Sequence, residues 1–138
     1  HESSLSPCIH SVVASKIKNL DKAYELYLRT ARLDLDDYNN EAREGLHITS
    51  MSGSWLAIVK GFAGMRVKDD KLYFEPIIPS RWKSYSFMIT FRNHVVKINV
   101  TQNFVELNHQ SIGEIVIKLQ EKDVLLSEKQ SIRVEIVR

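Results

Sequence analysis

A histidine, several hydroxyl-bearing residues and one glycine stand together at residues 47–55, with the sequence HITSMSGSW. An apolar run at helical spacing follows them (Leu56, Val59, Phe62, Ala63). The start of a helix presents unpaired backbone N–H groups and the positive end of the helix dipole, which together favour an anion. Glycine permits close approach of the backbone, and serine and threonine hydroxyls can donate further hydrogen bonds. The pattern therefore indicates an oxyanion or phosphate site, and the simpler alternative is an ordinary helix capped by serine.

Length and composition describe a globular chain of one ordinary domain or two very small ones. It has 138 residues, of which 43% are hydrophobic and 26% charged, and no apolar run approaches the ~20 residues of a membrane span. A net charge of +2 with interspersed signs gives no argument for nucleic acid. The single Cys8 excludes an internal disulfide, so we expect a reducing compartment and a cytoplasmic location, with no membrane partner. Because the chain begins at His1 without a methionine, we also expect it to be a piece of a longer protein.

Other common catalytic patterns are missing from the sequence. The five histidines and the cysteine show no zinc-ligand spacing, so no metal site is predicted. Serine, histidine and aspartate all occur, but without the G-x-S-x-G elbow that would support a hydrolase triad.

Apolar residues at helical spacing predict helices up to about residue 65. The first begins at Ser6, with Pro7 at its first position, and its apolar face comprises Ile9, Val12, Val13, Ile17 and Leu20. The second begins at Asp21 and forms an αα-hairpin with the first, and residues 32–45 are interpreted as a solvated irregular loop. The third runs from about Ser52 to Gly61 or Gly64, with Trp55 and Phe62 as core anchors.

After Met65 the hydrophobic period changes from 3.6 to 2, which predicts strands. Apolar residues alternate with polar ones most clearly at residues 85–91 and 96–101, with Arg92 and Asn93 turning the chain between them. Shorter alternating segments at 65–67, 72–74, 105–107, 115–119 and 132–136 continue the pattern. Short strands with polar turns are typical of an antiparallel sandwich. The fold class is therefore α+β, with residues 1–65 helical and residues 66–138 forming a β-sandwich domain.

Three stretches resemble, in order and spacing, the C-terminal part of the disaccharide phosphorylases of glycoside hydrolase family 65. They are HESSLSPCIH at 1–10, AYELYLRTARLDL at 23–35 and EGLHITSMSGSW at 44–55, and the likeness continues through GFAGMR at 61–66 and LYFEP at 72–76 to Trp82. The resemblance implies that residues 1–65 are the last helices of an (α/α)6 barrel. It also implies that residues 66–138 are the small C-terminal β-sandwich domain.

The resemblance also implies a reaction and a set of site residues. In that family inorganic phosphate attacks the anomeric carbon while a glutamic acid protonates the leaving oxygen, with inversion. The implied phosphate contacts are His47 first, then Ser50 and Gly53, and then Thr49; His1, Glu2, Ser3 and Ser4 would line the barrel mouth with no individual roles assigned. The family's catalytic glutamic acid lies upstream of the matching region, so we expect no catalytic residue in this chain and no activity from it alone.

The expected partners are a disaccharide such as maltose and inorganic phosphate as co-substrate in the full-length enzyme, with no further cofactor. Helix faces normally covered by other barrel helices would be exposed in this chain, which predicts self-association and a homo-oligomer. Two alternatives stay open: a non-catalytic carbohydrate-binding or interaction module based on the β-sandwich, and a dimerisation element. The sequence does not identify the disaccharide.

Overall fold

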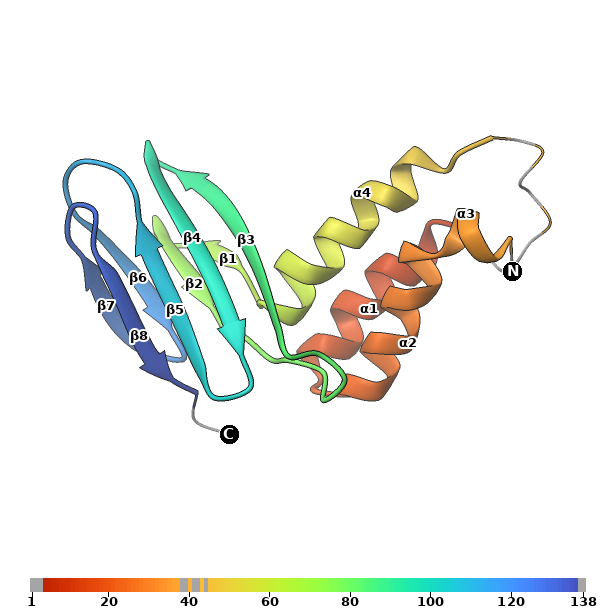
Figure 1. The fold of residues 1–138 in the computed structure, drawn as a ribbon, viewed down its shortest axis with the longest axis horizontal. Helices are drawn as coiled ribbons and strands as arrows, with labels where there is room; N and C mark the ends of the chain where they lie inside the picture. The colour runs from red at the N-terminus through yellow and green to blue at the C-terminus, as the bar shows by residue number, and fades with distance from the viewer. Residues whose placement is uncertain (1–3, 38–39, 41–42, 44, 137–138) are drawn as a thin grey trace. The chain divides into compact units, whose positions relative to one another are not determined.

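The computed structural model describes residues 4–37, 40, 43 and 45–136. The chain divides into two compact units, residues 1–62 and residues 63–138 (Figure 1). The first unit contains helices and the second contains strands, so the predicted order of helices followed by strands is confirmed.

Two helices of similar length form the predicted hairpin in the first unit. They are α1 (Ser6–Lys16) and α2 (Leu20–Ala31), which lie side by side (Figure 1). Leu5, not Ser6, occupies the N-cap of α1 and makes no side-chain cap hydrogen bond, so the predicted serine cap is wrong by one residue. Asn19 is the N-cap of α2, and its side chain accepts a hydrogen bond from the Lys22 N–H. Helix α2 therefore begins one residue earlier than predicted.

The remaining helices differ from the prediction at their starts. A four-residue helix, α3 (Leu33–Asp36), lies within the segment interpreted as an irregular loop. The next helix, α4, runs from Ile48 to Leu56 and continues directly into a π-helical segment, η2 (Ala57–Phe62). Because α4 begins four residues before Ser52, most of the hydroxyl- and glycine-containing motif lies inside the helix rather than ahead of it.

Close packing in the helical unit depends on small residues. A Cβ atom placed on Gly53 of α4 would lie 2.8 Å from Cβ and 2.9 Å from Sγ of Cys8 on α1. Gly61 in η2 contacts α1 in the same way, with Ser15 Oγ 3.1 Å from its hypothetical Cβ. Gly61 therefore lies inside the helical segment and does not end it, whereas Gly64, at φ +61°, adopts the left-handed conformation predicted for a helix end.

The predicted apolar core of the first unit is only partly buried. Phe62 is fully buried and makes an edge contact with Tyr27 at 5.8 Å between ring centroids, so its prediction as a core anchor is confirmed. Trp55 is 48% exposed, and its prediction as an anchor is wrong. Ile9, Val13 and Ile17, three residues of the predicted apolar face of α1, are at least half exposed, because α1 packs through its small residues instead.

The second unit consists of two four-stranded sheets (Figure 1). One has the order β1-β2-β6-β7, comprising Arg66–Lys68, Lys71–Phe74, Ile115–Leu119 and Lys122–Leu126. The other has the order β3-β4-β5-β8, comprising Ser84–Phe91, His94–Thr101, Phe104–His109 and Ser131–Glu135. The predicted sandwich is confirmed with one correction: β2 and β6 pair in parallel. Strand β7 was not predicted, because Lys122 and Asp123 obscure its short apolar run.

Alternation of burial along the strands follows the predicted pattern. On β4, Val96, Ile98 and Val100 are buried, while Lys97 is exposed. The turn between β3 and β4 lies at Arg92 and Asn93, both with positive φ, which suits the twist of a two-residue hairpin.

The loop between β2 and β3 connects the two sheets. Two side chains fix it: Tyr85 of β3 and Gln102 in the turn between β4 and β5. Tyr85, 8% exposed, donates its hydroxyl hydrogen to the carbonyl of Ile77 at 3.0 Å. The amide of Gln102 donates to the carbonyls of Pro79 and Trp82 at 3.0 and 2.8 Å. These bonds satisfy loop carbonyls that would otherwise lack strand partners.

Candidate functional site

His47 lies at the N-cap of α4 and is held by an aspartate from α3. The Asp34 carboxylate is 2.6 Å from His47 Nδ1, and its two oxygens lie 3.1 and 3.3 Å from the His47 backbone N–H. An ionised carboxylate is an acceptor only. The backbone N–H and the ring of His47 therefore both donate, and Nδ1 carries a proton. The carboxylate therefore fixes the backbone and the ring of the same residue.

The electrostatics of this pair favour its charged state. Hydrogen bonding from the His47 side chain, followed by that from its backbone N–H and by the charge of its ring, holds the pKa of Asp34 below its ordinary value; partial desolvation opposes this. The two side chains are 17% and 20% exposed, so water still reaches them. An ionised Asp34 beside the ring in turn favours a protonated imidazole, which is suited to an anion.

Ser50 joins the two stretches that the sequence predicted to form the site. Its hydroxyl, on the first turn of α4, donates to the carbonyl of Ser4 at 2.9 Å, across 46 residues. Ser50 is 2% exposed. The bond brings the described end of the predicted barrel-mouth segment to the turn that follows His47. His1, Glu2 and Ser3 lie outside the described residues.

Thr49 and Gly53 occupy different environments. Thr49 is exposed on the first turn of α4, two residues after His47. Gly53 is buried one turn later, where a helical N–H bonds to the carbonyl four residues earlier, and it packs against Cys8. Its geometry supports a packing role, and the predicted contact between its N–H and phosphate gains no support from the structure.

Asp34 was missed by the sequence interpretation, which placed residues 32–45 in a solvated loop. The available signal was weak: an alternating Leu-Asp-Leu-Asp run, in which Leu33 is 5% exposed and Leu35 is 77% exposed. The alternation does not report burial here, because the two leucines differ and the segment is a short helix, and it does not distinguish Asp34 from Asp36.

In the β unit, two histidines contact each other, and their contact has a structural explanation. His109 is 1% exposed, and its Nδ1 lies 2.9 Å from the carbonyl of Ser127. Because a carbonyl only accepts, His109 Nδ1 donates to it, and His109 Nε2 lies 2.9 Å from His94 Nδ1. The pair satisfies the polar atoms of a buried ring between β4, β5 and the turn before β8.

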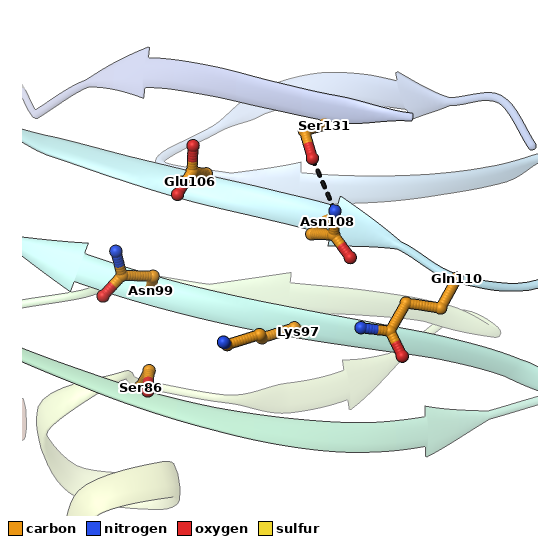
Figure 2. Close-up of a pocket in the computed structure, with 7 residues that line it drawn as sticks. All are labelled: Ser86, Lys97, Asn99, Glu106, Asn108, Gln110 and Ser131. Carbon is orange, nitrogen blue, oxygen red and sulfur yellow. Dashed lines mark hydrogen bonds between the residues drawn. The ribbon is translucent and has the colours of Figure 1, made fainter. Parts of the chain in front are cut away.

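A polar groove lies along the outer face of the β3-β4-β5-β8 sheet (Figure 2). Its volume is about 390 Å³, and its lining residues are Ser86, Lys97, Asn99, Glu106, Asn108, Gln110 and Ser131. The amide of Asn108 donates to Ser131 Oγ within it. An aromatic platform for sugar stacking would favour the carbohydrate-binding alternative, and none of these lining residues is aromatic. Tyr85 is instead buried and contacts Trp82 and Phe87.

The described part of the chain lacks two further kinds of feature. No helix there has the length and hydropathy to span a membrane. No group of three or more histidine, cysteine, aspartate or glutamate side chains there could hold a metal ion.

Comparison with known families assigns both units. Residues 1–56 match the family profile of the glycosyl hydrolase family 65 central catalytic domain, and residues 65–126 match that of the family 65 C-terminal domain. The two units thus correspond to consecutive domains of a class of carbohydrate-active enzymes. The chain belongs to glycosyl hydrolase family 65.

Individual relatives agree with this assignment. The chain is 56% identical to the maltose phosphorylase of Bacillus subtilis over 127 residues, covering 87% of this chain and 17% of that protein. It is 41% identical to the α,α-trehalose phosphorylase of Geobacillus stearothermophilus over 134 residues, covering 97% and 18%. A solved chain from the human microbiome, provisionally named a kojibiose phosphorylase, superposes with a TM-score of 0.92 at 38% identity, covering all of this chain and 20% of that one. The chain therefore spans less than a fifth of the length of these two curated relatives.

Proposed function

We propose that this chain supplies the closing helices of an (α/α)6 catalytic barrel and the C-terminal β-sandwich of an inverting α-glucoside phosphorylase. The observation that carries the proposal is the 56% identity to a maltose phosphorylase across both units. In the proposed reaction inorganic phosphate attacks the anomeric carbon of a disaccharide such as maltose, and an upstream glutamic acid protonates the leaving oxygen. Inorganic phosphate is a co-substrate, and the reaction needs no further cofactor.

His47 is the proposed phosphate contact within this chain. Its pairing with an ionised carboxylate favours the imidazolium, which attracts a phosphate dianion. The contact would be made through Nε2, since Nδ1 donates to Asp34. Thr49 is exposed on the adjacent turn and is the second proposed contact. Ser50 contributes by fixing the Ser4 carbonyl beside the start of α4.

Exposed apolar side chains on two helices support the place of the first unit in a larger barrel. Ile9, Val13 and Ile17 of α1 are 55%, 50% and 70% exposed, and Ile48 and Trp55 of α4 are 63% and 48% exposed. Large apolar residues at one helical spacing normally face a partner surface. We infer that other helices of the catalytic domain cover them.

A chimera tests this function with the residues of this chain. The chain would replace its matching segment in the Bacillus subtilis maltose phosphorylase, and the product from maltose and phosphate would be followed by NMR. We expect β-glucose 1-phosphate, because inversion at an α-glucoside gives the β-anomer, and the 138-residue chain alone should give no product. A chimera that folds with the melting transition of the parent but releases only glucose, or no product, would refute the proposal.

A further inference from the structure

We propose that Asp34 is a positioning residue: its carboxylate holds the imidazole of His47 with Nδ1–H toward α3, so that Nε2 is presented to phosphate. This inference rests on the proposed phosphate contact of His47 and adds a residue to it. Asp34 belongs to a helix of four residues in a segment between α2 and α4.

The contacts between the two residues constrain His47 more than a single ion pair would. One Asp34 oxygen is 2.6 Å from Nδ1, and the carboxylate also accepts the His47 backbone N–H at 3.1 and 3.3 Å. The backbone bond fixes the Cα position at the N-cap of α4. The side-chain bond then selects both the tautomer and the rotation of the ring.

The neighbouring acid on α3 is directed elsewhere. Asp36 forms a two-point pair with Arg32, at 2.6 Å to Nη2 and 2.8 Å to Nε. Asp34 and Asp36 therefore carry the same charge on the same short helix. Asp34 pairs with His47, whereas Asp36 pairs with Arg32. This makes Asp36 a matched control for the loss of a carboxylate from α3.

The arrangement has a known physical consequence in other sites. When a histidine ligand donates one ring N–H to a carboxylate, the other nitrogen is oriented toward its ligand, and loss of that carboxylate weakens binding or activity about 10–100-fold at metal sites. Phosphate binding depends less on the orientation of the ring than metal coordination does. We therefore expect an effect near the lower end of this range, about tenfold.

The first experiment measures the ring itself in the 138-residue chain. Long-range ¹H–¹⁵N spectra of the imidazole nitrogens distinguish Nδ1–H from Nε2–H. We expect the wild type at neutral pH to show a protonated Nδ1 for His47. Asp34→Asn should change the Nδ1 signal, and Asp36→Asn should leave it unchanged. A wild-type ring protonated only at Nε2, or an Nδ1 signal insensitive to Asp34→Asn, would overturn the proposal.

The second experiment measures kinetics in the chimera described above. Asp34→Asn should raise the KM for phosphate about tenfold and leave the KM for maltose unchanged. Asp34→Glu, which keeps the carboxylate, should recover part of the loss, and Asp36→Asn should match the parent chimera. A merely structural role of Asp34 would instead lower the melting temperature and alter both KM values together, which would refute positioning.

The two proposals fail in different ways. If the unmodified chimera makes no β-glucose 1-phosphate, the proposed function fails, whereas the ring tautomer in the chain still decides whether Asp34 fixes His47. If the chimera is active but Asp34→Asn leaves the KM for phosphate unchanged, the function stands and the positioning role fails.

Discussion

Gly53 offers a direct test of whether the glycine in the HITSMSGSW motif serves packing or anion binding. Replacing it with alanine adds one methyl group. That group would lie 2.8 Å from Cβ and 2.9 Å from Sγ of Cys8, and 3.5 Å from a methyl of Thr30. Carbon atoms in contact normally stay about 3.5–4.0 Å apart, so α1 and α4 must separate.

Two opposing terms set the magnitude of Gly53→Ala. Inserting a methyl group into a close-packed contact costs roughly 1–3 kcal/mol, and two contacts below 3.0 Å place this case in the upper half of that range. Alanine in a helix interior recovers about 0.5–1 kcal/mol relative to glycine. The net loss of unfolding free energy is therefore about 1–2 kcal/mol.

Urea unfolding of the 138-residue chain, followed by circular dichroism, measures this loss. With a slope near 2 kcal/mol/M, the midpoint should fall by roughly 0.5–1 M. Gly61→Ala is the matched control, because its nearest neighbour, Ser15 Oγ, would be 3.1 Å away and the next atom 3.4 Å, and it should cost less. In a Cys8→Gly background the close contact is absent, so Gly53→Ala should stabilise the chain by about 0.5–1 kcal/mol, giving a coupling of about 2–3 kcal/mol. A Gly53→Ala chain as stable as wild type would refute the packing argument.

Four further outcomes follow from the structure. Tyr85→Phe removes a buried hydroxyl and leaves the Ile77 carbonyl unpaired, so urea unfolding should show a loss of roughly 1 kcal/mol. Burial raises the pKa of the Tyr85 phenol above its ordinary value of 10.0. The contribution of the neutral phenol to stability is therefore fully present below about pH 10 and is lost above it. Tyr85→Phe should reduce the alkaline loss of stability, and a pH profile identical to that of the wild type would contradict this. The lowered pKa of Asp34 gives the opposite sign: its contribution is present above the ordinary value of 3.8 and is lost as pH falls below it, so Asp34→Asn should flatten the acid limb of a melting-temperature profile. The exposed apolar residues of α1 and α4 should make the isolated chain self-associate and bind a hydrophobic dye, and light scattering of a clean monomer without dye binding would refute this.

The strands were predictable because alternation reports burial directly. On β3, Tyr85 is buried, and Phe87, Ile89 and Phe91 are less exposed than the residues that alternate with them. A sheet face has a period of two regardless of what covers it, so the local pattern is enough. Sheet order and direction were not predictable in this way. The parallel pairing of β2 with β6 joins segments more than forty residues apart, and nothing in either strand's composition encodes its partner.

Helix α1 has the apolar face that the periodicity predicted, but that face is not the one that packs within the unit. Ile9, Val13 and Ile17 recur every four residues, yet their side chains are exposed, and the contacts of α1 within the unit use Cys8, Ser11 and small neighbours. Ser11, fully buried, donates its hydroxyl hydrogen to the Ala23 carbonyl at 2.8 Å on α2. Periodicity indicates that a face needs a partner, but it does not say that the partner lies in the same 138 residues.

The motif at residues 47–55 combines two roles that its composition alone does not separate. Its buried side, with Ser50 and Gly53, fastens α4 to the Ser4 carbonyl and to α1, and these residues need their small size and hydroxyl for that purpose. Its first residue, His47, is held by Asp34 rather than by the helix, since it makes no side-chain cap hydrogen bond to α4. Ser50 and Gly53 therefore fix where α4 lies, and in the proposed function the anion would be bound chiefly by the imidazole of His47. If Ser50→Ala raised the KM for phosphate as much as His47→Ala did, this separation of packing from anion binding would be wrong. Loss of the Ser4 tether should instead lower the melting temperature first.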